Sequence, residues 1–272
     1  MNEKHYNGGE NDSPLHFLIS IAIITLNEQE NLSRTLESLS GFADEIIIVD
    51  SGSTDSTHEI ARKAGCKVFI EEWKGYATQK NSAFEKCTGE WALFLDADEV
   101  PEKSLLDEIK NEIRNSKADS YYIRRKSFYL GKLLNHSWQP DYVLRLARRS
   151  KNPEWRGGSV HEYLKVEGKA GYLNGVLIHY SYKDVSEHFR KTIEYAKLSS
   201  DDYFKTGKKF SILNLIFNPV AAFIRLYIIN RGFLDGIRGL IAASSSFVYT
   251  FLKYAFLFEK TDGFQKYRYN DK

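Results

Sequence analysis

The sequence predicts an α/β fold built around a doubly wound, mostly parallel sheet. Short apolar runs at 19–25, 45–49, 67–70 and 91–95 alternate with stretches of helical periodicity, and the loops between them are short. The first and last runs are almost continuously apolar, as strands buried on both faces of a parallel sheet usually are. Acidic residues follow closely, at the edge where open α/β sheets bind their ligands.

The composition is that of an ordinary globular protein. The 272 residues are 42% hydrophobic and 27% charged, enough for one large domain or a domain with an appendage. A formal net charge of +2 gives no reason to expect a nucleic-acid partner. Cys66 and Cys87 lack zinc-ligand spacing, so we expect reduced thiols in a cytosolic protein. Residues 1–16 are polar without the apolar segment of a signal peptide, which predicts a flexible tail.

The first half of the chain alternates between strand and helix. Asn27 followed by Glu30 resembles a capping box, so a helix should begin directly after the first strand. Asp50 ends the second strand, and a turn rich in Ser, Thr and Asp leads into a second helix. A helix over 77–86 precedes the fourth strand. Glu28 and Asp50 are therefore expected at the same edge of the sheet.

The fourth strand ends in an acidic cluster, Asp96-Ala97-Asp98-Glu99. Two like charges about 4 Å apart repel by roughly 4 kcal/mol at an effective dielectric near 20, so a bound cation would stabilise the cluster. Oxygen ligands of this kind suit Mg²⁺ or Mn²⁺ carrying substrate phosphates. The alternative is a helix N-terminus, because Asp, Glu and Pro101 all favour a first helical turn.

Two common phosphate-binding signatures are absent from the sequence. No G-x-G-x-x-G follows the first strand, and no G-x-x-x-x-G-K-[ST] occurs anywhere. This absence disfavours dinucleotide dehydrogenases and P-loop enzymes. Phosphates would have to be held by a metal ion and basic side chains.

After Pro101 the pattern changes to that of a mixed sheet extension. The expected elements are a helix over 103–115 and strands over 120–128, 142–146 and 171–180. The loops between them are long and rich in Gly, Trp and charge, and long ordered loops are often functional. Asp184 and Glu187 form a second candidate capping box, which opens a helix to about Thr206.

The C-terminal part, 201–272, is basic and rich in apolar runs. Between 203 and 260 it holds eight Lys or Arg and two acids. Asn218-Pro219 and Arg225 interrupt one apolar run and Lys253 the other, so we expect no transmembrane helix. Basic residues interleaved with Phe, Tyr, Leu and Ile favour helices lying in an anionic membrane surface. The alternatives are a helical subdomain packed on the sheet, or an interface between two copies of the chain.

Four segments hold the residues at these strand ends. They are TLNEQENL (25–32), IIIVDSGSTDST (46–57), GYATQKNSAF (75–84) and FLDADEVP (94–101). Together they resemble the donor-binding motifs of family 2 glycosyltransferases, which implies the GT-A nucleotide-sugar fold for 17–200. GKLLNHSWQPDYVLRLARR and EWRGGSVHEYL further resemble a bacterial branch that includes lipopolysaccharide core β-1,4-glucosyltransferases.

The resemblance implies a donor site built from several strand ends. Thr25, Asn27 and Glu28 would line the nucleoside pocket. Asp50 would accept a hydrogen bond from the uracil imide or its neighbourhood.

Other donor contacts are implied in the third and fourth motifs. Lys80 and Asn81 would approach the base or the diphosphate, where a cation suits phosphate. Asp96 would contact the ribose or the sugar. Asp98 would bind the divalent cation, Mg²⁺ or Mn²⁺, that bridges the two phosphates. Glu99 would either assist this cation through a water molecule or have a structural role.

Sugar transfer with inversion needs a base opposite the departing diphosphate. We expect Glu162, on a loop containing two glycines, to take the acceptor proton, with Asp141 as the second candidate. His161 would contact the diphosphate or orient the site. The family's commoner base motif is an acidic pair, and His161-Glu162 stands in its place here.

A basic set is expected on the acceptor side. Its members are Arg124, Arg125, Lys126, Arg145, Arg148 and Arg149. A phosphorylated or acidic saccharide would suit them, and solvated charge on strand edges is the alternative. Trp138 and Trp155 could stack on sugar faces or pack inside the fold.

These observations predict an inverting, metal-dependent glycosyltransferase at the cytoplasmic face of a bacterial inner membrane. The expected donor is a UDP-hexose, most simply UDP-glucose, and the acceptor a lipid-linked or lipopolysaccharide-core sugar. A nucleotidyltransferase would also use an Asp-x-Asp metal site, and a non-catalytic membrane-associated nucleotide-sugar binder is the second rival.

Overall fold

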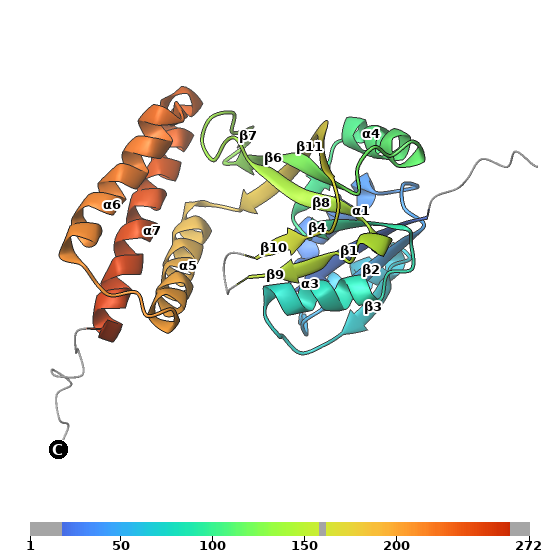
Figure 1. Ribbon diagram of the computed structural model, residues 1–272, viewed down its shortest axis with the longest axis horizontal. Coiled ribbons are helices and arrows are strands. Elements are labelled where there is room, and N and C mark those ends of the chain that lie inside the picture. Colours follow the sequence, from blue (N-terminus) through green and yellow to red (C-terminus); the bar gives the residue numbers. More distant parts are fainter. Residues whose placement is uncertain (1–17, 158–161, 262–272) are drawn as a thin grey trace, which may run out of the picture.

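The computed structural model describes residues 18–157 and 162–261. Figure 1 shows an α/β body beside a layer of long C-terminal helices. The strands are β1 (Ile19–Thr25), β2 (Glu45–Asp50), β3 (Lys67–Ile70), β4 (Trp91–Asp96), β5 (Glu99–Pro101), β6 (Ser120–Tyr129), β7 (Lys132–Leu133), β8 (Tyr142–Arg148), β9 (Glu154–Arg156), β10 (Tyr163–Lys165) and β11 (Ala170–Tyr182). The α-helices are α1 (Gln29–Ser38), α2 (Thr57–Lys63), α3 (Tyr76–Glu85), α4 (Lys103–Arg114), α5 (Val185–Lys205), α6 (Ile212–Ile224) and α7 (Ile237–Thr261).

The main sheet is mixed and mostly parallel on its amino-terminal side. Its order is β3-β2-β1-β4-β8-β6-β11-β5, with β7 beside β6, and β9 and β10 form a separate hairpin. Strands β1 to β4 pair in parallel, whereas β8 runs antiparallel to both β4 and β6. The predicted α/β class and the mixed extension are confirmed.

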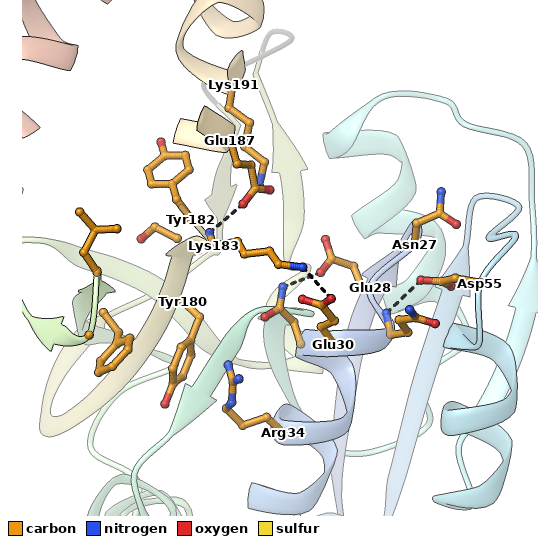
Figure 2. A pocket seen from close by; sticks show the side chains of 16 residues that line it. Asn27, Glu28, Glu30, Arg34, Asp55, Tyr180, Tyr182, Lys183, Glu187 and Lys191 are labelled. Carbon is orange, nitrogen blue, oxygen red and sulfur yellow. Dashed lines mark hydrogen bonds and ion pairs between the residues drawn. The ribbon is translucent and has the colours of Figure 1, made fainter. Parts of the chain in front are cut away.

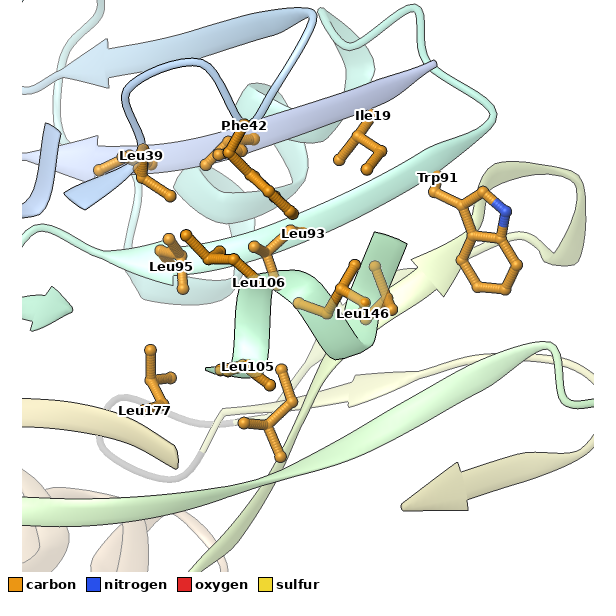
Figure 3. Close-up of a cluster of buried hydrophobic side chains, with 14 of the residues drawn as sticks. Ile19, Leu39, Phe42, Trp91, Leu93, Leu95, Leu105, Leu106, Leu146 and Leu177 are labelled. Carbon is orange, nitrogen blue, oxygen red and sulfur yellow. The ribbon is translucent and has the colours of Figure 1, made fainter. Parts of the chain in front are cut away.

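The central strands are buried on both faces, as their apolar runs predicted. In β4, Leu93 and Leu95 share a core cluster with residues of α1 and α4, including Leu105 (Figure 3). Phe94 points to the opposite face and packs in a second cluster with Ala83 of α3. The α1 and α3 helices therefore cover opposite faces, and the polar strand ends lie at the sheet edge between them.

Two local predictions are corrected by the backbone. Asn27 adopts a left-handed conformation with φ of 54°, and α1 begins after Glu28 without a side-chain cap. The predicted capping box at Asn27 is therefore wrong. The acidic cluster is no helix N-terminus either, because β4 turns directly into β5 and the N-cap position of α4 is Glu102. The second capping box is confirmed, since Asp184 accepts the Glu187 N–H at 2.7 Å.

The C-terminal helices form a layer in which α7 lies between α5 and α6. The boundary predicted at residue 200 falls inside α5. The predicted interruption at Asn218-Pro219 and Arg225 is wrong, because a π-helical turn from Arg225 to Ile229 continues α6. By length and composition, the helical segments Ile212–Ile229 and Ile237–Thr261 could each cross a membrane.

Candidate active site

The ends of β1 and β2 are locked together by one buried carboxylate. Asp50 is fully buried and accepts hydrogen bonds from the Thr25 hydroxyl (2.7 Å), from both the hydroxyl and N–H of Ser53, from the Gly52 N–H, and contacts His58 Nε2 at 2.6 Å. Burial alone would raise the pKa of Asp50, but these hydrogen bonds lower it to about 2. Thr25 and Asp50 are therefore held together at the predicted nucleoside pocket. The oxygens of Asp50 are already occupied by hydrogen bonds from within the chain.

Asn27 and Glu28 lie in the turn between β1 and α1. The Asn27 side-chain oxygen accepts the Thr54 N–H at 2.8 Å, which ties the β1–α1 turn to the β2–α2 turn. Glu28 is half-buried and accepts a hydrogen bond from the Asn31 amide at 2.9 Å. Burial raises the pKa of Glu28, and the nearby Asp98 carboxylate adds to that effect. These two residues remain available to a ligand at the sheet edge.

Helix α3 contributes a buried cation. Lys80 is 7% exposed, and its ammonium lies 2.8 Å from Asp96 Oδ1, 3.1 Å from Glu162 Oε1 and 4.4 Å from the Trp155 ring centroid. The neighbouring Asn81 pairs both atoms of its amide with the backbone of Trp155. Asn81 therefore ties β9 to α3.

Seven charged side chains form an ion-pair chain across the site. In order they are Glu162, Lys80, Asp96, Arg145, Glu99, Arg125 and Asp141. Arg145 Nη2 lies 2.7 Å from Asp96 and 2.9 Å from Glu99, and Glu99 is fully buried. Burial alone would raise the pKa of Asp96, yet Lys80 and Arg145 hold it well below its ordinary value. The two candidate bases, Glu162 and Asp141, are the ends of this ion-pair chain.

Asp98 stands apart from the ion-pair chain and faces a histidine. His179 Nε2 of β11 lies 3.2 Å from Asp98 Oδ2, and Ser181 Oγ is 3.1 Å from the other ring nitrogen. Burial lowers the pKa of His179, but the Asp98 carboxylate outweighs this and raises it. Sequence reasoning missed His179; an imidazole near the end of a predicted strand was the available signal.

The Asp98–His179 pair fits a divalent cation. No group of three or more metal-ligating side chains occurs in the described residues. Two protein ligands suffice where substrate phosphates and water complete the coordination, as is usual for Mg²⁺. A carboxylate with an imidazole held by Ser181 also suits Mn²⁺, because an outer hydrogen bond fixes the ring.

Of the predicted catalytic residues, Glu162 and Asp141 can be placed. Glu162 is half-buried on the approach to β10 and bound to Lys80. Asp141 Oδ2 accepts a hydrogen bond from Arg125 Nε at 2.8 Å. His161 lies outside the described residues.

The predicted acceptor set is divided by the fold. Arg145 and Trp155 are each 4% exposed, so neither offers a free surface to a saccharide in this structure. Arg124 is half-buried on β6, and Arg125 is committed to Glu99 and Asp141.

Two further members of that set lie elsewhere. Arg148 pairs in register with Trp91, at the start of β4, and Arg149 follows it. Because β8 is antiparallel to β4, both lie at the edge opposite the acidic cluster, so the interpretation of all six cations as one acceptor surface is wrong. Trp138, half-buried, packs against Tyr129 and His188.

A cavity of about 460 Å³ opens on the α1 side of Glu28 (Figure 2). Its walls come from α1, the end of β6, the end of β11 and the start of α5. Lys183 reaches Glu30 across it at 2.7 Å, and Arg34 lies over the Tyr180 ring. Asp96 and Asp98 do not line it, although the Tyr180 N–H donates to the Asp98 carbonyl at 2.9 Å.

The sequence pattern of Glycosyl transferase family 2 matches residues 20–172, more than half of the chain. The chain is a family 2 glycosyltransferase. The match spans all seven residues of the ion-pair chain, whereas His179, on β11, lies beyond it. Membership makes the chain an enzyme of hexosyltransferase type and disfavours the nucleotidyltransferase and the non-catalytic binder.

Similar proteins agree with this assignment. The lipopolysaccharide core biosynthesis glycosyltransferase LpsC of Rhizobium meliloti is 34% identical over 89% of this chain and 92% of its own. An uncharacterized glycosyltransferase of Rickettsia typhi is 30% identical over 87% and 84%. The mannosyltransferase PcManGT of Pyrobaculum calidifontis shares the fold, with a TM-score of 0.53 at 14% identity over 91% of this chain and 89% of that one. These likenesses confirm the GT-A fold for this glycosyltransferase.

Proposed function

We propose that this family 2 glycosyltransferase transfers a hexose, glucose first, from a UDP-sugar to a lipopolysaccharide-core or other lipid-linked saccharide with inversion. The observation that carries the proposal is the meeting of Asp98 and His179 with the Lys80–Asp96 pair at one sheet edge. A diphosphate needs both a metal site and a nearby cation, and the sequence supplies no glycine-rich phosphate loop. The 34% identical LpsC, by its name, acts in lipopolysaccharide core biosynthesis.

On the donor side, Asp98 and His179 would hold Mg²⁺ or Mn²⁺, which when bound neutralises charge on the departing diphosphate. PcManGT, a relative in fold, is described in complex with GDP-mannose and Mn²⁺. Asn27 and Glu28 would contact the nucleoside. Asp96, fixed by Lys80 and Arg145, would accept hydrogen bonds from the ribose or sugar.

Lys80 would exchange one of its carboxylate partners, Glu162, for the diphosphate when the donor binds. It now bridges Asp96 and Glu162, with contacts of 2.8 and 3.1 Å. An arriving diphosphate would compete with Glu162 for the ammonium, because phosphate oxygens carry more charge than one carboxylate. Glu162, once released, would take the proton from the attacking acceptor hydroxyl.

The test compares the two candidate bases. Glu162→Gln keeps the shape of the side chain, so Mn²⁺-dependent UDP binding should persist while transfer falls by roughly 10²- to 10⁴-fold. Asp141→Asn, at the other end of the ion-pair chain, should retain most of its turnover. If the two variants exchange these results, Asp141 is the base. Full activity in both variants would show that the catalytic base is neither Glu162 nor Asp141.

The donor can be identified from slow hydrolysis without an acceptor. With Mn²⁺ present, UDP-glucose should release UDP faster than other UDP-hexoses release UDP, and faster than GDP-mannose releases GDP. Preferred release of GDP would overturn the UDP assignment, and release of pyrophosphate would revive the nucleotidyltransferase. Trials with truncated core oligosaccharides would then identify the acceptor.

The acceptor's lipid would be reached through the C-terminal helices. We propose that the enzyme lies on the cytoplasmic face of the inner membrane, peripherally, with α6 against the lipid. Leu213, Ile216 and Phe217 are each more than half exposed, and only Arg225 is charged between Ile212 and Ile229. Helix α7 packs on α5, beside the catalytic body, which favours helices lying along the surface over helices crossing it.

A further inference from the structure

The cavity between α1, β11 and α5 reaches both the proposed nucleoside contacts and the proposed metal pair. Asn27 and Glu28 line it at the end of β1, and Ser181 lines it on β11. The Ser181 hydroxyl lies 3.1 Å from Nδ1 of His179, whose other ring nitrogen contacts Asp98. A nucleoside diphosphate that joins these two groups would therefore have its phosphates beside this cavity, facing helix α5.

Helix α5 presents a lysine to this cavity. Lys191 and Glu187, one turn apart on α5, line the wall opposite the end of β1 (Figure 2). The Lys191 ammonium lies 3.0 Å from Glu187 Oε1 and 5.6 Å from the centroid of the Tyr182 ring. The Lys191 and Glu187 side chains are 28% and 27% exposed, so the ion pair is partly shielded but accessible from the cavity.

The ionisable groups of the donor site respond to this lysine. Burial raises the pKa of Glu28; the Asp98 carboxylate adds to this rise, and the Lys191 ammonium opposes it. Burial also raises the pKa of Tyr76, the first residue of α3, to about 12, and Lys191 again opposes the rise. Lys191 is therefore close to two elements that the donor would contact, the end of β1 and the start of α3.

The other cations near the donor site are less suited to the phosphates. Lys183 pairs with Glu30, and these side chains are 66% and 62% exposed, at the rim of the cavity. Arg34 stacks on an aromatic ring of β11. Lys80, on the other face of the sheet, divides its charge between two carboxylates. Lys191 has its carboxylate partner on its own helix, and an ion pair at this spacing adds little stability.

We propose that Lys191 binds the donor diphosphate, exchanging Glu187 for a phosphate oxygen when the donor and its cation are bound. The inference rests on the proposed function, because it adds a contact to the same donor site. The exchange is favourable because a diphosphate carries more negative charge than one carboxylate. The flexible four-carbon side chain of lysine lets the ammonium move between the two partners.

This contact would make α5 a part of the donor site. The family match ends at residue 172, before α5 begins at Val185. Lys191 therefore lies outside the motifs that predicted the other donor contacts. Its place over the site depends on the direction in which α5 leaves β11, which no local pattern in the sequence specifies.

The test measures binding of UDP, GDP and uridine to the full chain with Mn²⁺ present, by calorimetry for the nucleotides and by saturation-transfer NMR for uridine. Lys191→Met should weaken UDP binding about tenfold or more, because it removes a charged contact, and should leave uridine binding unchanged. Lys191→Arg should bind UDP nearly as the wild type does, because it keeps the charge. Lys63→Met removes a lysine from an ion pair of the same spacing on α2, so this matched control should change nothing.

Three outcomes would overturn the inference. They are unchanged UDP binding in Lys191→Met, an equal loss of uridine binding in that variant, and an equal loss of UDP binding in Lys63→Met. Failure of the proposed donor has a different signature, tighter binding of GDP than of UDP by the wild-type protein. The same comparison of variants made with GDP would then still test Lys191. Binding of neither nucleotide would contradict the donor and the inference together.

Discussion

At the scale of single residues, position in the sequence did not separate the roles of neighbouring acids. Asp96 and Asp98 are two residues apart, yet Asp96 binds Lys80 and Arg145 while Asp98 binds His179. Glu99, one residue further, is fully buried between Arg125 and Arg145. These contacts leave Asp98 as the candidate metal ligand, hold Asp96 between Lys80 and Arg145, and give Glu99 a structural place.

The metal site gives the first prediction. Asp98→Ala should abolish transfer and Mn²⁺-dependent UDP binding together, because it removes the carboxylate that contacts His179. His179→Ala should weaken Mn²⁺-dependent binding by at least the roughly 10- to 100-fold typical of losing an outer partner of a metal ligand. Asp107→Ala, an exposed pair with Lys103, is the control. Thermal-shift measurements of UDP binding with and without Mn²⁺ test this prediction. Full activity in Asp98→Ala would show that Asp98 is not the metal ligand.

At the scale of elements, the C-terminal helices position a loop of the catalytic body. The Asp235 carboxylate, in the turn between α6 and α7, accepts the N–H groups of Asn135, His136 and Ser137 at 2.6–3.1 Å. Burial alone would raise the pKa of Asp235, but these hydrogen bonds lower it. The same loop leads to Asp141 and the ion-pair chain, so helices and site are physically connected.

The second prediction concerns this connection. Asp235→Asn removes the charge and one acceptor, so the free energy of unfolding should fall by about 1–3 kcal/mol. Urea denaturation measures the loss. Asp107→Asn, on the surface of α4, should change stability by less than about 0.5 kcal/mol. An equal effect in both variants would show that the loop does not depend on Asp235.

The third prediction tests the contact between α6 and lipid. Ile216→Glu with Phe217→Glu should weaken binding to anionic vesicles by roughly tenfold or more, because each large apolar side chain contributes about 1.5–3 kcal/mol when buried. Ile70→Glu, equally apolar and 58% exposed on β3, is the control. Alkaline carbonate should release the wild-type protein from membranes. Retention after carbonate would mean that the helices cross the bilayer.

At the scale of the whole molecule, the α/β body and the C-terminal helices meet at a cluster of aromatic side chains. His188 of α5 is 1% exposed, stacks on Tyr182 with ring centroids 4.2 Å apart, and is hydrogen-bonded through Nδ1 to the Tyr129 hydroxyl at 2.8 Å. Burial lowers the pKa of His188 to about 4. The folded protein therefore keeps this imidazole neutral where the unfolded chain protonates it.

The fourth prediction follows from that difference. His188 contributes its full stabilisation above its unfolded pKa of about 6.5 and loses it as pH falls toward 4, by at most about 3 kcal/mol. His188→Phe should be less stable near neutral pH, because the Tyr129 hydroxyl loses its partner, but its unfolding free energy should change less between pH 6.5 and 4. Urea titrations at several pH values give the difference between the two proteins. Parallel pH profiles would contradict the buried neutral imidazole.

The sequence by itself determined the seven longer strands, their approximate bounds and the edge that carries the site, but not the short strands β5, β7, β9 and β10. Apolar runs of strand length and short loops specify such a sheet locally, so β1 to β4 and the acidic ends at Glu28, Asp50 and Asp96 were predictable. The motifs at those ends also predicted the family that the match over 20–172 confirmed.

Only the tertiary structure decided which polar groups are free and which are occupied. Asp96 meets Arg145 from 49 positions away and Lys80 meets Glu162 from 82, separations that no local pattern encodes. Antiparallel pairing of β8 with β4 buried Arg145 and moved Arg148 to the far edge. The physical reason is that a side chain's role depends on the partners that burial brings to it, and those partners are chosen by the packing of distant elements.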